Sequence, residues 1–358
     1  MKKQVKFNLN KQSGNARTGL LQVGEKQVTT PALVQTGDTI TTLTPGELTK
    51  LGTTAIKQSV LPYCLAASEG QHPDFGDLHT RLQWPGLVVG DTGAEQAYRW
   101  AKPRGRKKNG VSFHEPASGQ QKLYTPEIAM EWQAKLGCDL QSTFARWENY
   151  YSPVDDLQAA AKQTASWLDT ANPGSLATIT GGGLKRLRRF SVEAVQGHQF
   201  SGYNLAGIDE DVKLTEQVRV IRETTAMLPA AGVRYLSTCG SLEQALLAII
   251  NGIDLVDSDC AGQAARHGVA FNRTKRIHLV KEHFLADQGP LVSGCGCPTC
   301  RAGYSRSYLH QLTLAKSPLG VRLLLIHNLY AVNHLLAQLR QAIATGQVDD
   351  FADDLAIG

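Results

Sequence analysis

Three cysteines and one histidine in the C-terminal part of the chain form the pattern with the clearest chemical meaning. Cys295, Cys297 and Cys300 lie within GCGCPTC, and His327 follows in a later apolar segment. Thiolate sulfur and imidazole nitrogen are preferred ligands of Zn²⁺, and four of them fill a tetrahedral shell. A filled shell has no place for water, so we predict a structural zinc ion. Free cysteines beside a core histidine are the alternative, although such dense spacing is uncommon by chance.

Two aspartates stand at the ends of short apolar runs. Asp91 closes GLVVGD, and Asp257 closes IDLVD. Paired carboxylates on different strands can divide a glycosyl transfer, because one can attack the anomeric carbon while the other moves protons. The alternative is structural, since an aspartate at such a position often caps the following helix.

The elements that must position these residues follow one alternating pattern. Apolar runs rich in β-branched residues alternate with helix-like segments, and cap-like residues precede three of the latter, at Thr125, Ser152 and Ser241. The predicted strands span residues 54–60, 86–90, 138–144, 176–180, 203–208, 233–238 and 253–257. The predicted helices span residues 126–136, 155–168, 214–227 and 242–251.

This alternation predicts an α/β protein built as a (β/α)₈ TIM barrel. An antiparallel hairpin at residues 5–28 is expected to form a lid over its bottom, and residues 270–345 a zinc-binding insertion with a helical tail at 319–345. We expect residues 1–358 to form one domain. A doubly wound open sheet is the alternative, but no G-x-G-x-x-G fingerprint follows the first strand.

Composition indicates the kind of partner and the cellular compartment. The net charge is +5, which leans mildly toward a polyanionic partner, and basic residues cluster at 102–108 and 185–189. A solvated charged face explains either cluster equally well. The N-terminus has no apolar run after its lysines, so we expect no signal peptide. We also expect no apolar stretch to reach the length of a membrane span, and the seven cysteines fit a reducing cytoplasm.

Several segments together resemble the tRNA-guanine transglycosylase family, also called queuine tRNA-ribosyltransferases. The resemblance runs from TPALVQTGDTITTLTPGEL to the tail, and its most specific part is GCGCPTCRAGYSRSYLHQL followed by LLLIHNLY. The family's strand before the substrate-reading loop resembles KLGCDLQSTF in this chain. The strand that carries the family's nucleophile resembles NGIDLVDSD.

The resemblance implies a zinc-containing barrel that acts as a pentosyltransferase without ATP or an organic cofactor. Such enzymes replace guanine in tRNA with a 7-deazaguanine-type base. By motif position, Asp257 matches the nucleophile that forms a covalent ribosyl intermediate, and Asp91 matches the general acid/base. Cys295, Cys297, Cys300 and His327 match the zinc ligands. The family also implies dimerisation, as a homodimer or with another family member.

The positions expected to bind the purine or 7-deazapurine base depart from the family pattern. The chain has DTGAEQ where DSGGFQ is typical, so Glu95 replaces a stacking aromatic residue beside Gln96, and Ala145 replaces a base-reading aspartate. The other predicted substrate-binding positions are Gly181, Gly207 and Arg266. An unpaired donor edge on the base costs about 1–3 kcal/mol, and loss of stacking costs a further ~1–3 kcal/mol.

Three interpretations therefore remain open from the sequence. The first is an active transglycosylase with an altered base or polynucleotide preference. The second is a non-catalytic accessory paralogue that binds RNA or an active partner. The third is a family member that acts on DNA. Both aspartates are present, which favours the first and third, whereas the altered pocket favours the second.

Overall fold

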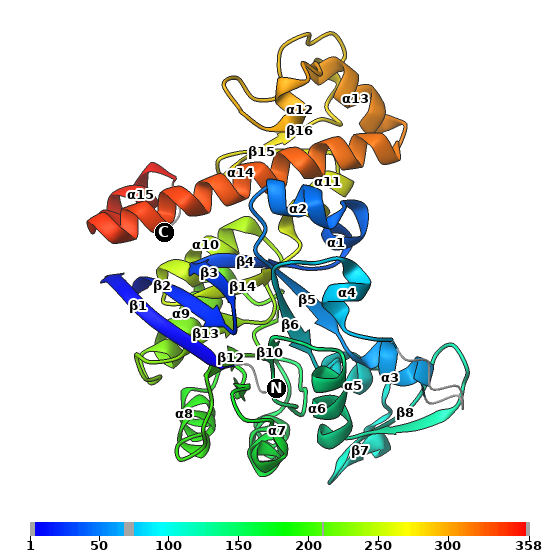
Figure 1. The fold of residues 1–358 in the computed structure, drawn as a ribbon, viewed down its shortest axis with the longest axis vertical. Helices are drawn as coiled ribbons and strands as arrows, with labels where there is room; N and C mark the ends of the chain where they lie inside the picture. Colours follow the sequence, from blue (N-terminus) through cyan, green and yellow to red (C-terminus); the bar gives the residue numbers. More distant parts are fainter. Residues whose placement is uncertain (1–3, 68–74, 210, 356–358) are drawn as a thin grey trace.

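A parallel sheet of eight strands forms the centre of the molecule. The computed structural model describes residues 4–67, 75–209 and 211–355 (Figure 1). The strand order is β10-β6-β5-β4-β14-β13-β12-β11, and a bridge between Ser142 and Leu176 links the two outer strands. The predicted (β/α)₈ barrel is thus confirmed as a nearly closed barrel. Its strands are β4 (Ala32–Gln35), β5 (Ala55–Ser59), β6 (Leu87–Asp91), β10 (Leu140–Gln141), β11 (Leu176–Ile179), β12 (Gly202–Leu205), β13 (Val233–Leu236) and β14 (Leu255–Ser258).

Helices follow the barrel strands and cover the outside of the sheet. Within the described chain these are α1 (Asp38–Thr42), α2 (Pro45–Lys50), α3 (Leu61–Ala67), α4 (Leu78–Leu82), α5 (Ala94–Trp100), α6 (Pro126–Lys135), α7 (Val154–Ser166), α8 (Lys185–Ala194), α9 (Leu214–Thr225), α10 (Leu242–Ile250) and α11 (Cys260–Arg266). Two single 3₁₀ turns, η1 (Pro103–Gly105) and η2 (Leu168–Thr170), lie between them. Between α5 and α6 the chain adds a small antiparallel sheet of β7 (Arg106–Lys107), β8 (Gly110–His114) and β9 (Gln121–Tyr124).

The helix starts show which sequence signals act in the fold. Ser241 and Gln244 form a reciprocal capping box at α10, and the Thr125 hydroxyl accepts the Ile128 amide at α6. The prediction for Ser152 is wrong, because Pro153 occupies the cap position of α7 and makes no side-chain capping bond. Strand β4 and helices α1 to α5, α8 and α11 are additions to the predicted barrel elements.

The N-terminal hairpin lies against the bottom of the barrel, as predicted, and gains a third strand. Strands β1 (Val5–Ser13), β2 (Ala16–Val23) and β3 (Lys26–Thr30) form it. Leu21 and Val28 pack with residues that begin the barrel strands, such as Leu87. The buried guanidinium of Arg17 pairs with Asp254, at 2.7 Å between Nη2 and Oδ2. Apolar packing and this ion pair together attach the sheet to the barrel.

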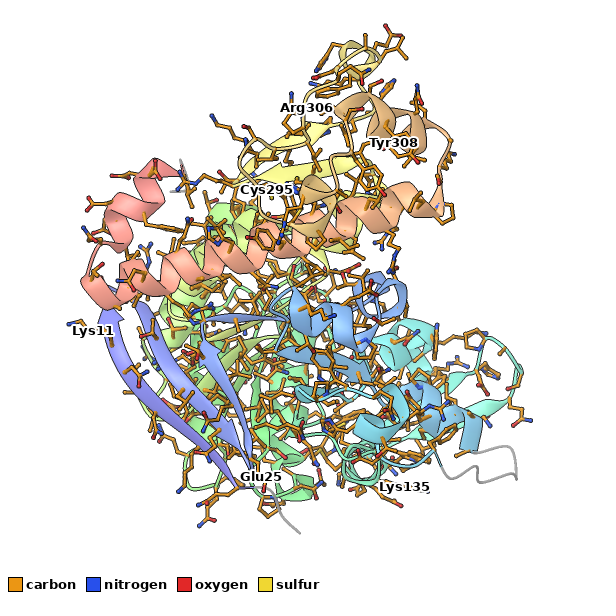
Figure 2. The ribbon with its side chains drawn as sticks, turned by 45° about the horizontal axis from the view of Figure 1, so that its top comes forward. Lys11, Glu25, Lys135, Cys295, Arg306 and Tyr308 are labelled. Carbon is orange, nitrogen blue, oxygen red and sulfur yellow. The ribbon has the colours of Figure 1, made fainter. Side chains whose placement is uncertain are left out.

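The C-terminal segment crosses the barrel and carries the cysteine-rich loop. It contains β15 (Val269–Asn272), β16 (Lys275–His278), η3 (Glu282–Phe284), α12 (Pro298–Arg301), α13 (Arg306–Leu314), α14 (Pro318–Thr345) and α15 (Val348–Asp354). The long helix α14 runs across the molecule, with α12, α13 and the β15–β16 hairpin on its far side from the barrel (Figure 1). Figure 2 shows Cys295 near this helix and Glu25, in the β2–β3 turn, at the opposite end of the molecule.

Helix α14 corrects one expectation from the sequence. By length and composition its 28 residues could cross a membrane, with a mean hydropathy of 1.2 over the most apolar window. However, 56% of that window is buried inside the protein. Leu324 and Leu329 join the core cluster beneath α2 and α4, and Leu336 and Ile343 join the cluster beneath α9 and α10. The buried leucines of α14 are therefore core residues of the folded chain.

Candidate active site and metal cluster

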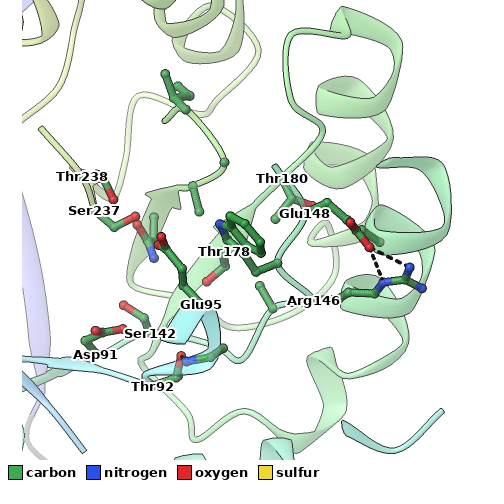
Figure 3. Close-up of a pocket in the computed structure, with 18 of the residues that line it drawn as sticks. Asp91, Thr92, Glu95, Ser142, Arg146, Glu148, Thr178, Thr180, Ser237 and Thr238 are labelled. Atoms are coloured by element: carbon green, nitrogen blue, oxygen red, sulfur yellow. Dashed lines mark hydrogen bonds and ion pairs between the residues drawn. The ribbon is translucent and has the colours of Figure 1, made fainter. Parts of the chain in front are cut away.

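A cavity of about 270 Å³ opens where the barrel strands end. The inner face of the barrel changes from apolar at its base, with Ala55 and Leu87, to polar at this end, with Asp91 and Asn204. Ligands of α/β barrels bind at this face, because the loops after the strands surround it. Six of the sequence-predicted site residues line the cavity: Asp91, Glu95, Gln96, Ala145, Gly181 and Gly207. Figure 3 shows Asp91 and Glu95 on the same side of it, across from Arg146 and Glu148.

Asp91 is held by a tight turn between β6 and α5. Its Oδ1 accepts the Gly93 amide at 3.1 Å. Gly93 has a φ of 70°, and a Cβ there would lie 2.5 Å from the Cβ of Leu61. Only glycine fits this conformation and this approach without strain. The turn starts α5 at once, so Glu95 and Gln96 reach the cavity wall.

Asp257 lies deeper and forms an ion pair with Lys57, a residue that the sequence analysis did not select. Asp257 is 3% exposed, and the Lys57 ammonium contacts its Oδ2. Lys57 lines the cavity, whereas Asp257 is absent from the described lining. Burial lowers the pKa of Lys57, but the charges of Asp257 and then Asp91 outweigh it, and the net pKa is raised. Lys57 is therefore a cation that separates the cavity from Asp257.

The strand register explains this arrangement. Asp257 pairs in register with Val34, and Val34 with Ala55. Lys57 comes two residues after Ala55, and because the tilted barrel strands are staggered by about one residue per strand, this offset brings its side chain level with Asp257. Asp91 pairs with Ser59, two residues after Lys57, and lies on the cavity wall where β6 ends.

Charged side chains around the predicted base-binding positions pair with one another. Glu95 accepts hydrogen bonds from Arg99 at 2.8 and 3.0 Å. Glu148, which is buried, pairs with Arg146 at 2.7 Å (Figure 3). The Arg99 guanidinium also lies 4.5 Å from the ring centre of Trp147. The cavity wall therefore carries both signs of charge in matched pairs beside one aromatic ring.

A buried arginine shapes the opposite wall. Arg188 donates hydrogen bonds to the carbonyls of Gly182, Ile179 and Gly207, at 2.9, 3.0 and 3.1 Å. Burial lowers its pKa to about 10. This corrects the interpretation of the basic cluster at 185–189, since Arg188 supports the glycine loops from within. Its neighbours Lys185, Arg186 and Arg189 follow the same loop at the start of α8.

The other basic segment, residues 102–108, is fixed close to the cavity. The side-chain amide of Gln163 donates to the Lys107 carbonyl at 2.6 Å, and the Trp167 indole donates to the Lys108 carbonyl at 3.2 Å. Arg106 pairs with the cavity residue Glu148 at 2.8 Å. A row of cations is thus anchored at the rim.

Arg266 is placed elsewhere. Its guanidinium pairs with Asp259 at 3.3 Å, and Asp259 also accepts the Thr39 hydroxyl at 2.7 Å. Within the described chain, neither Arg266 nor Asp259 lines the cavity. The predicted contact between Arg266 and the substrate stays a prediction.

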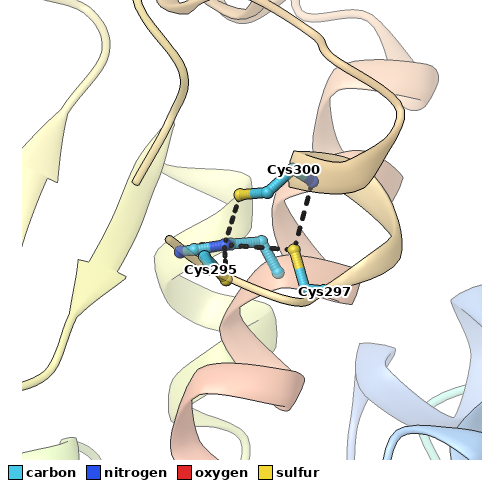
Figure 4. A group of neighbouring side chains, drawn as sticks. Cys295, Cys297 and Cys300 are labelled. Atoms are coloured by element: carbon cyan, nitrogen blue, oxygen red, sulfur yellow. Dashed lines mark hydrogen bonds between the residues drawn. The ribbon is translucent and has the colours of Figure 1, made fainter. Parts of the chain in front are cut away.

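The four sequence-predicted metal ligands meet beside α14. The Sγ atoms of Cys295, Cys297 and Cys300 and the Nδ1 of His327 all lie within 4.8 Å of one another (Figure 4). The three sulfurs are 3.7, 3.4 and 3.4 Å from that nitrogen. Metal–sulfur and metal–nitrogen bonds of about 2.3 and 2.1 Å at a tetrahedral angle predict a separation of about 3.6 Å. The cluster fits a tetrahedral ion with three sulfur ligands and one nitrogen ligand.

A backbone carbonyl orients the histidine of this cluster. The Nε2 of His327 is 2.8 Å from the Phe271 carbonyl oxygen, so this nitrogen donates its proton and Nδ1 faces the sulfurs. The hydrogen bond with Cys297 and the nearby His327 lower the pKa of the Cys300 thiol. His310 of α13 lies outside the cluster, and its Nδ1 contacts the Leu279 carbonyl oxygen at 2.5 Å.

Comparisons with known proteins agree with these observations. The family model described as queuine tRNA-ribosyltransferase matches residues 12–357. The queuine tRNA-ribosyltransferase of Actinobacillus pleuropneumoniae serotype 5b (strain L20) is 32% identical, over 97% of this chain and 94% of its own length. That of Gloeobacter violaceus is 31% identical, over 98% of this chain and 97% of its own length. With the barrel and the Cys₃His cluster in place, these matches show that the chain belongs to the queuine tRNA-ribosyltransferase family.

Proposed function

We propose that this protein is a pentosyltransferase that replaces guanine in tRNA with a 7-deazaguanine-type base, through a covalent ribosyl intermediate on Asp257. The observation that supports this most directly is the pair of carboxylates around Lys57. Asp91 lines the cavity, Asp257 contacts Lys57 inside the barrel, and both stabilise its ammonium charge. Two acids that serve one cavity satisfy the minimum for glycosyl exchange, which needs a nucleophile and a proton carrier.

In this proposal Asp257 attacks C1′ of the ribose and guanine departs with the electrons of the glycosidic bond. Asp91 exchanges protons with the bases. The incoming base then attacks C1′ and restores the Asp257 carboxylate. Because one glycosidic bond replaces another, the reaction needs no ATP, but it does need water to be excluded from the intermediate. The depth of Asp257, at 3% exposure, supports that exclusion.

The base pocket is proposed to differ from the usual one. Ala145 offers no carboxylate to the base, and Glu95 is engaged by Arg99. Trp147 is the aromatic residue beside the cavity, and its indole nitrogen has no hydrogen-bond partner among the described residues. A base stacked near Trp147 would recover part of the lost stacking energy, about 1–3 kcal/mol per base.

The proposed polynucleotide is tRNA, reached through the basic segment 102–108. Phosphates bind to arrays of lysine and arginine, and such binding weakens steeply as salt rises. This segment is anchored to α7 and to Glu148 at the rim of the cavity, where a strand that inserts one nucleotide would pass. The metal is proposed to be zinc, because three thiolates and one imidazole with tetrahedral spacing suit that ion. We also propose a cytoplasmic location and assembly as a dimer.

A second function has one specific observation in its favour. Asp257 is covered by a paired cation, a state that also suits a paralogue that binds RNA without catalysis. The first function remains our conclusion, because a scaffold has no need of two carboxylates beside one ammonium.

The test is an exchange and trapping experiment. Purified protein is incubated with labelled guanine and either tRNA or duplex DNA, and Asp257→Asn is compared with wild type. The matched control is Asp139→Asn, which removes a buried carboxylate paired with Lys26 at the other end of the barrel. We expect label to enter tRNA, and a covalent adduct that Asp257→Asn loses and Asp139→Asn retains. Exchange into DNA would show that DNA and not tRNA is the substrate. Binding of tRNA without exchange or adduct would establish the accessory function.

A further inference from the structure

Lys57 offers chemistry that the two carboxylates alone do not supply. It is the described cation in direct contact with Asp257, and it lies between that carboxylate and the cavity. A departing guanine carries the electron pair of the broken bond and needs a proton. The side chain nearest both the nucleophile and the cavity is an ammonium, which has protons to donate.

We propose that Lys57 is a catalytic residue that, in place of Asp91, gives its proton to the departing purine, and that the covalent state of Asp257 controls this transfer. The inference rests on the proposed function. When the Asp257 carboxylate bonds to C1′, it becomes a neutral ester and no longer balances the ammonium. The bond between C1′ and the base breaks, its electron pair leaves with the base, and Lys57 protonates the base and becomes a neutral amine.

The environment of Lys57 supports this timing. Burial lowers its pKa more strongly than any single neighbour raises it, and two of the four raising influences, a charge and a hydrogen bond, come from Asp257. The ester removes both. The amine state is then favoured at the moment when the base requires a proton. The same pair therefore holds the proton before the attack and releases it afterwards.

The return step balances the charges. The incoming base loses its ring N–H proton to Asp91, the other acid of the cavity wall, as its nitrogen attacks C1′. The ester bond breaks, and its electron pair restores the Asp257 carboxylate. That charge again favours the ammonium, so the proton passes from Asp91 to Lys57. The titratable groups that face this pair are Asp91 on β6, Glu95 on α5 and Tyr235 on β13.

Two substitutions separate this role from a purely structural one. Lys57→Arg keeps a cation beside Asp257 but cannot release a proton, because the guanidinium stays charged. Lys57→Met removes the charge and keeps a similar length. The matched control is Lys26→Met, which removes the ammonium from the buried carboxylate of Asp139 outside the cavity. We expect guanine release to fall by about 10²–10⁴-fold in both Lys57 variants, the usual range for loss of general acid catalysis, and to be unchanged in the control.

A second substrate provides a readout that a structural role would not affect. N7-methylguanine at the target position carries a positive charge before cleavage and departs as a neutral base without a proton. The defect of Lys57→Arg, measured against wild type on the same RNA, should therefore shrink to within about tenfold. If Lys57→Arg releases guanine at nearly the wild-type rate, or is equally slow with both bases, the inference is overturned and the proposed function stands. If wild type shows neither exchange nor adduct, the inference and the proposed function are both overturned.

Discussion

At the scale of single residues, the position of a side chain along its strand decides its chemistry. Lys57 and Asp257 are 200 residues apart in the chain, yet only β4 separates their strands in the barrel, and the two side chains meet inside it. Asp257 and Lys57 lie at one level of the barrel, and Asp91 lies at the end of its strand on the cavity wall. A buried carboxylate beside a cation remains ionised at low cost, whereas an isolated one would favour its protonated form.

The sequence reveals one part of this site better than the other. The metal ligands were predictable because three of them lie within six residues, and the chemistry of zinc selects their types. Asp91 and Asp257 were predictable because each closes an apolar run. Lys57 was not, because one lysine inside a strand has no local signal and its meaning depends on a distant partner.

The base pocket leads to a prediction at residue 145. Ala145→Asp should restore an acceptor for the donor edge of guanine, since Ala145 lines the cavity. We expect the KM for guanine to fall by about 5–150-fold, which corresponds to ~1–3 kcal/mol. Guanine exchange kinetics measure this. Ala145→Asn, similar in size but without the charge, is the control and should improve binding less. A KM that rises in both variants would show that the base binds elsewhere.

At the scale of elements, caps determine where helices begin, and two serines provide a direct comparison. Ser241 forms a reciprocal capping box at α10, whereas Ser152 makes no side-chain capping bond at α7. Ser241→Ala should lower the free energy of unfolding by about 0.5–2 kcal/mol. Ser152→Ala should change it by less than about 0.5 kcal/mol. Urea denaturation followed by circular dichroism tests both variants, and equal losses would contradict the role of the cap.

Strand β4 and helix α8 were not predicted from the sequence, and each omission has a physical reason. Strand β4 is separated from the N-terminal sheet by Pro31 alone, so no helix-like segment precedes it to mark it as a separate barrel strand. Helix α8 was obscured by its basic residues, which indicated a solvated surface. One of them, Arg188, is instead the most deeply buried residue of the helix, where it holds three carbonyls. Local patterns cannot reveal such burial.

At the scale of the whole molecule, the metal cluster attaches one segment to another. Cys295, Cys297 and Cys300 belong to a loop with little regular structure, and His327 belongs to α14. Removal of the ion should expose this loop to proteases while the barrel remains folded, because α14 keeps its apolar contacts with the barrel core. Structural zinc sites supply much of the folding energy of such loops.

Limited proteolysis with and without a chelator, together with metal analysis, tests this expectation. Wild type should hold about one ion per chain, and Cys300→Ser should lose the ion and its protection. Cys64→Ser is the control, because Cys64 lies on α3 outside the cluster. Retention of the metal and of protease resistance by Cys300→Ser would contradict the assigned ligands.

The order of the barrel strands has a consequence for synthesis on the ribosome. β4, the first barrel strand to emerge, pairs on one side with β5 and on the other with β14, the last. Until Leu255–Ser258 has been translated, both β4 and β13 keep an unpaired edge, and such edges invite association with other chains. Nascent chains paused before that point should depend most on chaperones. The same four residues include Asp257. Closure of the barrel and completion of the acid pair therefore occur at the same step of synthesis.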